Sequence, residues 1–178
     1  MNVERIGTAV LLLLLTAYPV RGQGKAVGGF HAYDGCGITF SGGAESRRFQ
    51  EIRLLADFEG VLQGREPLPG IRASVFSQQA LYRWDAPDGT VLTLFAGPGV
   101  TGGYVKDRGA SWGTLLGLSA DAGIRLQFSA PFELRAGFTA DLAGHWTVRN
   151  RYNNTLTYYH NGLINIFLPY IVIAFRFE

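Results

Sequence analysis

Residues 131–149 alternate between apolar and polar side chains almost without error. One parity holds Phe132, Leu134, Ala136, Phe138, Ala140, Leu142 and Trp146, and the other holds Glu133, Arg135, Thr139, Asp141, His145 and Arg149. Successive side chains of a β-strand point to opposite faces, so this period of two predicts a strand with two different surfaces. One surface needs an apolar surround, and the other needs partners for its charges. A barrel that spans a membrane supplies both.

The same alternation recurs along the chain and predicts eight strands. They cover residues 30–33, 37–41, 50–63, 71–84, 90–106, 112–128, 131–149 and 170–178. An even number returns both termini to one side, as single-chain bacterial barrels require. Residues 42–48, 86–89 and 129–131 would then be periplasmic turns. The sequence therefore predicts an all-β fold, an eight-stranded antiparallel up-and-down transmembrane β-barrel.

Three segments depart from regular alternation. The apolar parity changes near Ser77 and Gln78, which predicts a β-bulge. Pro98, between two glycines, cannot donate a ladder hydrogen bond and predicts a kink or bulge. Within residues 150–169, either residues 155–159 extend a hairpin above the membrane or residues 163–168 form a short apolar helix.

The first residues follow the pattern of an export signal, with Arg5 before a short apolar core and small residues after it. We expect a secretory signal peptide over residues 1–22 and a single β-barrel domain over residues 23–178. Cys36 is the only cysteine, so no intramolecular disulfide forms. Basic and acidic residues nearly balance, 16 against 14, so nucleic-acid binding is not indicated.

Alternation alone does not decide whether the apolar face meets lipid or lines a cavity. A soluble lipocalin-like, lipid-binding barrel has the same period with its faces reversed. Long alternating strands, abundant glycine on the polar face and aromatic residues near the strand ends favour the membrane. These aromatic residues are Trp84, Tyr104, Trp112, Trp146 and Tyr170.

On these strands, the chain after the signal resembles the small outer-membrane β-barrels of the OmpX and OmpW type. The resemblance implies the cell outer membrane of a Gram-negative bacterium as its location. It also implies outer-membrane lipid and lipopolysaccharide as surroundings, the barrel-assembly machinery as a partner during biogenesis, and a monomer. Such barrels usually end in an aromatic residue, whereas here Phe175 and Phe177 are followed by Glu178.

The polar parity predicts an interior rich in charges of both signs. An eight-stranded barrel is only wide enough for side chains to fill, so these charges are expected to pair and block passage. A small channel is the alternative and needs a wider barrel. The predicted interior polar network comprises Glu51, Arg53, Asp57, Glu59, Arg72, Asp121, Arg125, Glu133, Arg135, Asp141, His145 and Arg176.

An enzyme that modifies lipid A is a further alternative. Asp141 and His145 share one face and invite an acid–base interpretation with Ser119 as nucleophile. Residues four apart on a strand lie roughly 13 Å apart, so Asp141 cannot orient His145 directly. His31, His145 and His160 are scattered, so no metal site is predicted. We therefore expect a structural or surface-binding protein without catalytic residues or cofactors.

The predicted outer loops carry more basic than acidic residues. Arginine suits the phosphates of lipopolysaccharide, although solvated loop charges have the same composition. Both interpretations stay open. The lipopolysaccharide-facing candidates are Arg65, Lys106, Arg108, Arg149 and Arg151.

Overall fold

The computed structural model describes residues 25–32, 35–43, 47–62, 68–106, 112–150, 153–158 and 168–177. The predicted signal peptide lies outside the described residues. The strands are β1 Lys25–Ala32, β2 Gly35–Gly42, β3 Arg48–Asp57, β4 Gly70–Asp85, β5 Val91–Lys106, β6 Trp112–Gln127, β7 Phe132–Asn150, β8 Asn153–Tyr158 and β9 Leu168–Phe177, and one short helix, α2, covers Glu59–Leu62. No helix among these residues is long and apolar enough to cross a membrane.

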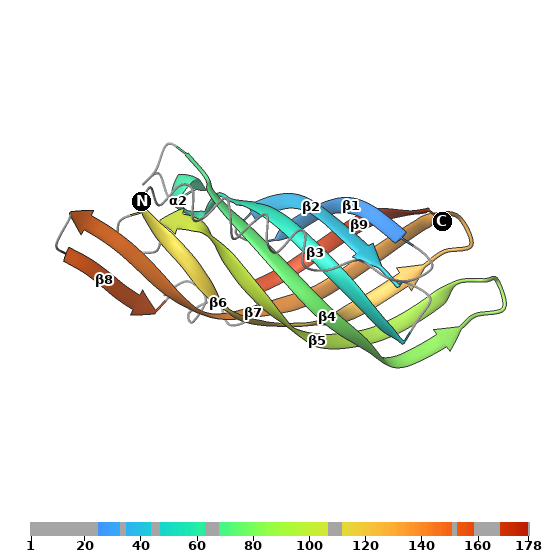
Figure 1. The fold of residues 1–178 in the computed structure, drawn as a ribbon. Helices are drawn as coiled ribbons and strands as arrows, with labels where there is room; N and C mark the ends of the chain where they lie inside the picture. The colour runs from blue at the N-terminus through green and yellow to red at the C-terminus, as the bar shows by residue number, and fades with distance from the viewer. Residues whose placement is uncertain are drawn as a thin grey trace.

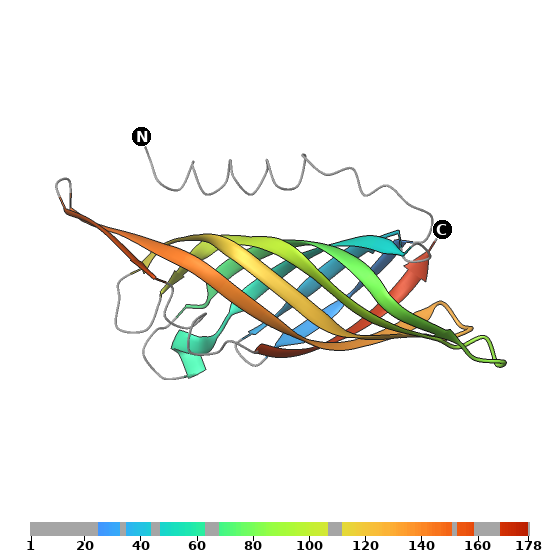
Figure 2. The same cartoon turned by 90° about the horizontal axis from the view of Figure 1, so that it is seen from below.

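Eight of the strands close into an antiparallel barrel, as the sequence predicts. Each strand from β1 to β7 pairs with the next, and β9 lies between β7 and β1 and closes the ring. β8 pairs with the far part of β7 and extends this strand as a hairpin beyond the barrel (Figures 1 and 2). The hairpin expected over residues 155–159 is therefore confirmed for residues 155–158, whereas residues 159–167 lie outside the described part.

The pairing register fixes the tilt of the strands. A row of paired residues starts at Ala80 on β4, passes through Phe95, Gly123, Gly137, Tyr170, Ala32, Gly35 and Asp57, and returns to β4 at Gly70. The displacement from position 80 to position 70 is the shear of the barrel. At a rise of roughly 3.3 Å per residue and a strand spacing of roughly 4.8 Å, this shear gives a tilt of roughly 40° and a backbone radius of roughly 8 Å. The interior therefore has room for side chains and little else.

Of the two expected irregularities, the bulge in β4 is present near its predicted position, whereas the break in β5 at Pro98 is not found. The register between β4 and β5 shifts between Ala80 and Tyr82, slightly beyond the expected position at Ser77 and Gln78. β5 is not broken at Pro98, because Pro98 pairs with Ala120 of β6. A Cβ on Gly99 would lie 2.4 Å from Cδ1 of Phe76. Glycine here makes room for an aromatic ring inside the barrel.

The predicted strand over residues 50–63 is wrong in its last part. β3 ends at Asp57, where its neighbours β2 and β4 also reach their last pairs, at Gly35 and Gly70. Without a neighbouring strand the chain forms α2, in which the backbone amide of Leu62 donates to the carbonyl of Phe58 at 2.8 Å. Glu59 therefore lies in α2 and not on the inner face of a strand.

Candidate functional site

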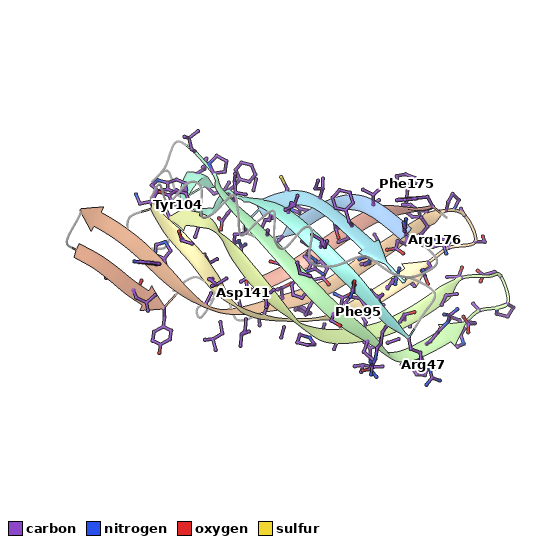
Figure 3. The ribbon with its side chains drawn as sticks, in the orientation of Figure 1. Arg47, Phe95, Tyr104, Asp141, Phe175 and Arg176 are labelled. Atoms are coloured by element: carbon purple, nitrogen blue, oxygen red, sulfur yellow. The ribbon has the colours of Figure 1, made fainter. Side chains whose placement is uncertain are left out.

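The inner face of the barrel carries most of the predicted polar network. Ten of the twelve predicted residues are buried, namely Glu51, Arg53, Asp57, Arg72, Asp121, Arg125, Glu133, Arg135, Asp141 and His145. Arg176 is half-buried at the end of the barrel where the chain terminates, opposite to the end that holds Tyr104 (Figure 3). Its guanidinium donates to the carbonyls of Phe128 and Ala130, so it fastens the turn between β6 and β7.

Arg53 contacts side chains of β3, β4, β6, β7 and β9. Its Nε donates to Glu51 Oε1 at 2.8 Å, and its Nη2 lies 2.8 Å from Asp121 Oδ2. The ring centroids of Phe76 and Tyr170 lie 4.6 and 4.1 Å from the guanidinium carbon of Arg53. Cation–π attraction is strongest where the cation is desolvated. The guanidinium of Arg53 is therefore held by two carboxylates and by two aromatic rings.

Neutral side chains complete the shell of Asp121. The Tyr170 hydroxyl donates to Oδ2 at 3.0 Å, and the Thr139 hydroxyl donates to Oδ1 at 3.0 Å. The amide of Gln78 donates to Asp121 and, at 3.1 Å, to Glu51 Oε2. A buried carboxylate is costly unless several donors replace its hydration shell. These three residues supply such donors.

A second group of charges continues the network towards the end where the chain terminates. The two carboxylate oxygens of Glu133 accept hydrogen bonds from Arg125 Nη2 at 2.9 Å and from Arg135 Nε at 2.6 Å. Arg135 also lies 3.1 Å from Glu51 Oε2, and Arg125 stacks 4.7 Å from the Phe49 ring. Glu51 therefore connects this group to Arg53, and the charges of β3, β6 and β7 form one network.

A third group lies towards the opposite end. Arg72 bridges Asp57 at 3.3 Å and Asp141 at 3.2 Å, and the Ser119 hydroxyl donates to Asp141. His145 is fully buried, and its Nε2 donates to the carbonyl of Val105 at 3.1 Å. The hydroxyl of Thr147 lies 3.5 Å from Nδ1.

The geometry does not assemble a catalytic triad from these residues. Ser119 hydrogen-bonds Asp141, whereas both ring nitrogens of His145 have other partners. A triad needs the histidine between the nucleophile and the acid. Among the described residues, no group of three or more His, Cys, Asp or Glu side chains is placed to hold a metal ion.

Sequence reasoning missed the uncharged part of the interior. Gln78, Phe49, Phe76 and Phe95 are buried on the inner face. Tyr170 was expected among the aromatic residues at the membrane surface, and this was wrong, because its side chain is 3% exposed and binds Asp121. The sequence did hold a signal for this position, because Tyr170 shares the inward parity of β9 with Val172 and Ala174. A Cβ on Gly137 would lie 2.7 Å from the Tyr170 hydroxyl, so the opposing glycine makes room for this ring.

The outer face of β5, β6, β7 and β9 is predominantly apolar and carries aromatic residues at both ends. At one end Tyr104 stacks on Trp112 at 5.6 Å, and Trp146 lies in the same row as Tyr104. At the other end Phe132 contacts Phe128 at 5.3 Å and Phe175 at 6.1 Å. The outward side chains between these bands include Leu116, Leu118, Ile124, Phe138 and Leu142, all exposed.

The spacing of the two aromatic bands matches a bilayer. From Phe132 to Trp146 the strand rises roughly 45 Å, or roughly 35 Å along the axis at a tilt of roughly 40°. The hydrocarbon core of a bilayer is about 30 Å thick, and aromatic side chains prefer its two boundaries. A charged interior inside an apolar, aromatic-edged exterior defines the class of membrane β-barrels.

A comparison with solved structures supports this fold. The chain is similar to the N-terminal β-barrel domain of OprF from Pseudomonas aeruginosa, with a TM-score of 0.51 and 10% sequence identity, over 88% of this chain and 98% of that one. At this identity the similarity shows the fold alone. No family model and no curated protein matches the sequence.

The basic residues expected to face lipopolysaccharide are only partly described. Lys106 lies at the end of β5 beside Trp112, its partner on β6, and is half-buried. Arg149 lies in β7, although its side chain is outside the described part, as are Arg65, Arg108 and Arg151.

Proposed function

We propose that this protein is an integral outer-membrane β-barrel of the OmpX and OmpW type, with a closed polar interior and a structural or surface-binding role. The observation that carries the proposal is the pairing of the buried charges. Arg53, Arg72, Arg125 and Arg135 each lie within 3.3 Å of a carboxylate oxygen. Removing such a charge from its partner in a narrow interior is costly, so the network opposes the passage of solutes.

The distribution of polarity favours the membrane over a soluble lipocalin-like barrel. A lipocalin keeps its apolar side chains inside to line a ligand cavity. Here the inner face carries the charges, and exposed leucine and phenylalanine cover the outer face. An apolar surface of this size is costly in water and favourable in lipid.

In the proposed orientation the end with Tyr104, Trp112 and Trp146 faces the cell exterior. Both ends of the barrel chain, Lys25 and Phe177, then lie on the periplasmic side, where they pair with each other. Lys106, Arg65, Arg108, Arg149 and Arg151 would meet the phosphates of lipopolysaccharide. The barrel would be inserted by the assembly machinery as a monomer.

Two measurements test this proposal. Fractionation is expected to find the mature chain in the outer membrane, with a heat-modifiable band on a detergent gel. Recovery from the soluble periplasm contradicts the proposal and favours the lipocalin-like alternative. In planar bilayers we expect no steady conductance of porin size, and a stable open channel contradicts the closed interior.

A further inference from the structure

Four polar side chains lie together on the outer face of β3 and β4. We call Arg48, Gln50, Ser77 and Gln79 the polar quartet. In the register of the two strands Arg48 pairs with Gln79, and Gln50 pairs with Ser77. Alternate residues of the same strands, Glu51 and Gln78, are buried on the inner face, so the quartet points outwards. Arg48, Ser77 and Gln79 are exposed, and Gln50 is half-buried.

The depth of the quartet in the membrane follows from the pairing register. A row of paired residues leads from Phe138 on β7 through Ala122 and Ala96 to Gln79. Phe138 lies roughly 15 Å above Phe132 at the rise and tilt given above, and each step of the row towards β4 descends by roughly 3 Å. Gln79 therefore lies roughly 6 Å above Phe132. The row is apolar on β5, β6 and β7 and carries an amide on β4.

Three members of the quartet lie within the depth of the hydrocarbon. Ser77 is higher than Gln79 on β4, at roughly 11 Å above Phe132, and its partner Gln50 is one step lower, at roughly 8 Å. Arg48 lies at roughly 3 Å. A hydrocarbon core of about 30 Å, centred between aromatic bands that are roughly 35 Å apart, begins roughly 3 Å above Phe132. Arg48 is therefore at the boundary, and the other three side chains are inside it.

Hydrocarbon cannot satisfy the hydrogen-bonding groups of the quartet. A glutamine amide has both donors and an acceptor, and a polar group without partners is costly away from water. Among the described residues, no donor reaches Oε1 of Gln50. The phosphate and ester oxygens of a phospholipid accept hydrogen bonds and donate none. A partner for the quartet must therefore offer donors as well as acceptors at this depth, which favours protein over lipid.

A second copy of the barrel offers such a partner. A two-fold axis along the membrane normal keeps every residue at its own depth and brings the same surface of both copies together. With this axis between β3 and β4, β3 of each copy faces β4 of the other. Gln50 then lies opposite Gln79 and Ser77 of the second copy, which are within roughly 3 Å of its depth. Amide and hydroxyl groups both donate and accept, so the surface is complementary to itself.

The other side chains on this face are compatible with close approach of two copies. The two Arg48 side chains lie at the boundary, where phosphates and water surround their like charges. Above the quartet the outward positions are apolar, with Ile52 on β3 and Val75 and Ala73 on β4. These apolar side chains can pack across the same axis.

We propose that the outer face of β3 and β4 is an interface between two copies of this chain, in which Gln50 of each copy hydrogen-bonds Gln79 or Ser77 of the other within the periplasmic leaflet. This inference rests on the membrane location proposed above. The barrel is inserted as a monomer and then pairs within the bilayer, which goes beyond the monomer that the family resemblance implies. The apolar outer faces of β6 and β7 stay in contact with lipid.

Cross-linking of the full mature chain in phosphatidylethanolamine and phosphatidylglycerol vesicles tests the interface. Cys36 is the only cysteine and is replaced by serine. Ser77→Cys then places a thiol in the quartet, and the matched control, Ala136→Cys, places it on β7 at roughly 10 Å above Phe132, nearly the same depth. A short bifunctional maleimide joins the thiols of neighbouring copies. We expect the cross-linked dimer to form several-fold more readily at position 77 than at position 136.

The other outcomes overturn the proposal in distinguishable ways. Equal cross-linking at both positions means that the copies meet by random collision. A folded barrel without cross-linking at position 77 means that lipid covers the quartet. Absence of the heat-modifiable band in both variants means that the barrel is not inserted, which contradicts the membrane location as well.

A second measurement tests the two amides. Gln50→Leu/Gln79→Leu in the Ser77→Cys background removes both amides, and the barrel is expected to stay folded because leucine is favourable on a lipid-facing surface. The matched control, Ala122→Leu, adds an apolar side chain on β6 outside the interface. We expect the leucine pair to lower cross-linking at position 77 several-fold and Ala122→Leu to leave it unchanged. Unchanged cross-linking in the leucine pair overturns the role of Gln50 and Gln79.

Discussion

Replacing Arg53 by methionine tests whether the interior network stabilises the barrel. Methionine keeps an unbranched side chain that can pack between Phe76 and Tyr170 but removes the guanidinium. Glu51 keeps Arg135 at 3.1 Å and a hydrogen bond from Thr39. Asp121 loses the guanidinium that lies 2.8 Å from its Oδ2 and keeps neutral donors. The loss therefore falls mainly on Asp121.

The size of the effect follows from the burial of this pair. The side chains of Arg53 and Asp121 are 3% and 0% exposed. Removing one partner of a buried ion pair costs about 3–5 kcal/mol, because the other charge is left uncompensated. We expect Arg53→Met to lower the free energy of unfolding by this amount. The matched control is Arg83→Met, since Arg83 pairs with Asp85 at 3.0 Å on the exposed hairpin. Loss of an exposed pair costs at most about 1 kcal/mol.

Reversible urea unfolding in lipid vesicles, followed by tryptophan fluorescence and by the gel shift of the folded barrel, measures both variants. The double variant Arg53→Met/Asp121→Asn isolates the pair. Residues in one network couple by about 0.5–3 kcal/mol, so the two changes are expected to cost less together than the sum of their separate effects. The reasoning is refuted if Arg53→Met is no more destabilising than Arg83→Met, or if the two changes of the pair are additive.

Three further predictions concern other parts of the molecule. Leu118→Arg and Phe138→Arg, both on the outer face, are expected to make insertion and folding less favourable by roughly 2–4 kcal/mol near the bilayer midplane. Phe138→Leu is the control, and tolerance of both arginines contradicts the assigned facing. His145→Ala leaves the Val105 carbonyl without the imidazole donor and is expected to lower the free energy of unfolding by about 1–3 kcal/mol, while the lipid A composition of cells stays unchanged. An altered lipid A profile in an intact barrel supports the enzyme alternative instead. In the turn between β4 and β5, hydrogen bonds from the backbone amide and hydroxyl of Thr90 lower the pKa of Asp88. Thr90→Val removes the hydroxyl and is expected to raise the pKa of Asp88 towards its ordinary value in an NMR titration. An unchanged pKa rules out the hydroxyl as a cause.

Alternation predicted the fold and the facing of side chains because both depend on local geometry. A period of two assigns each residue to one face wherever its strand continues. The inner parity of β7 correctly placed Glu133, Arg135, Asp141 and His145 in the interior, where all four are buried. The number of strands in the closed ring was also predictable, since turn residues separate the alternating runs.

Features that depend on neighbouring strands were not predictable in this way. The end of β3 at Asp57 is set by where β2 and β4 stop, so alternation alone wrongly extended this strand to Glu59 and beyond. Tyr170 was assigned to the membrane boundary from its residue type, although its parity placed it inside. Residue preference at a boundary is a statistical tendency, whereas parity within a strand is a geometric constraint. Where the two disagreed, parity was correct.

The shear of the barrel decides which charges meet, and this explains why the pairs were not predictable although their members were. Arg53 on β3 and Asp121 on β6 are far apart in the sequence, and their contact depends on the displacement between positions 80 and 70 that closes the ring. The resulting pairs connect β3, β4, β6 and β7 across the interior, so none of these strands can move without separating buried charges. A barrel closed in this way is suited to act through its outer surface.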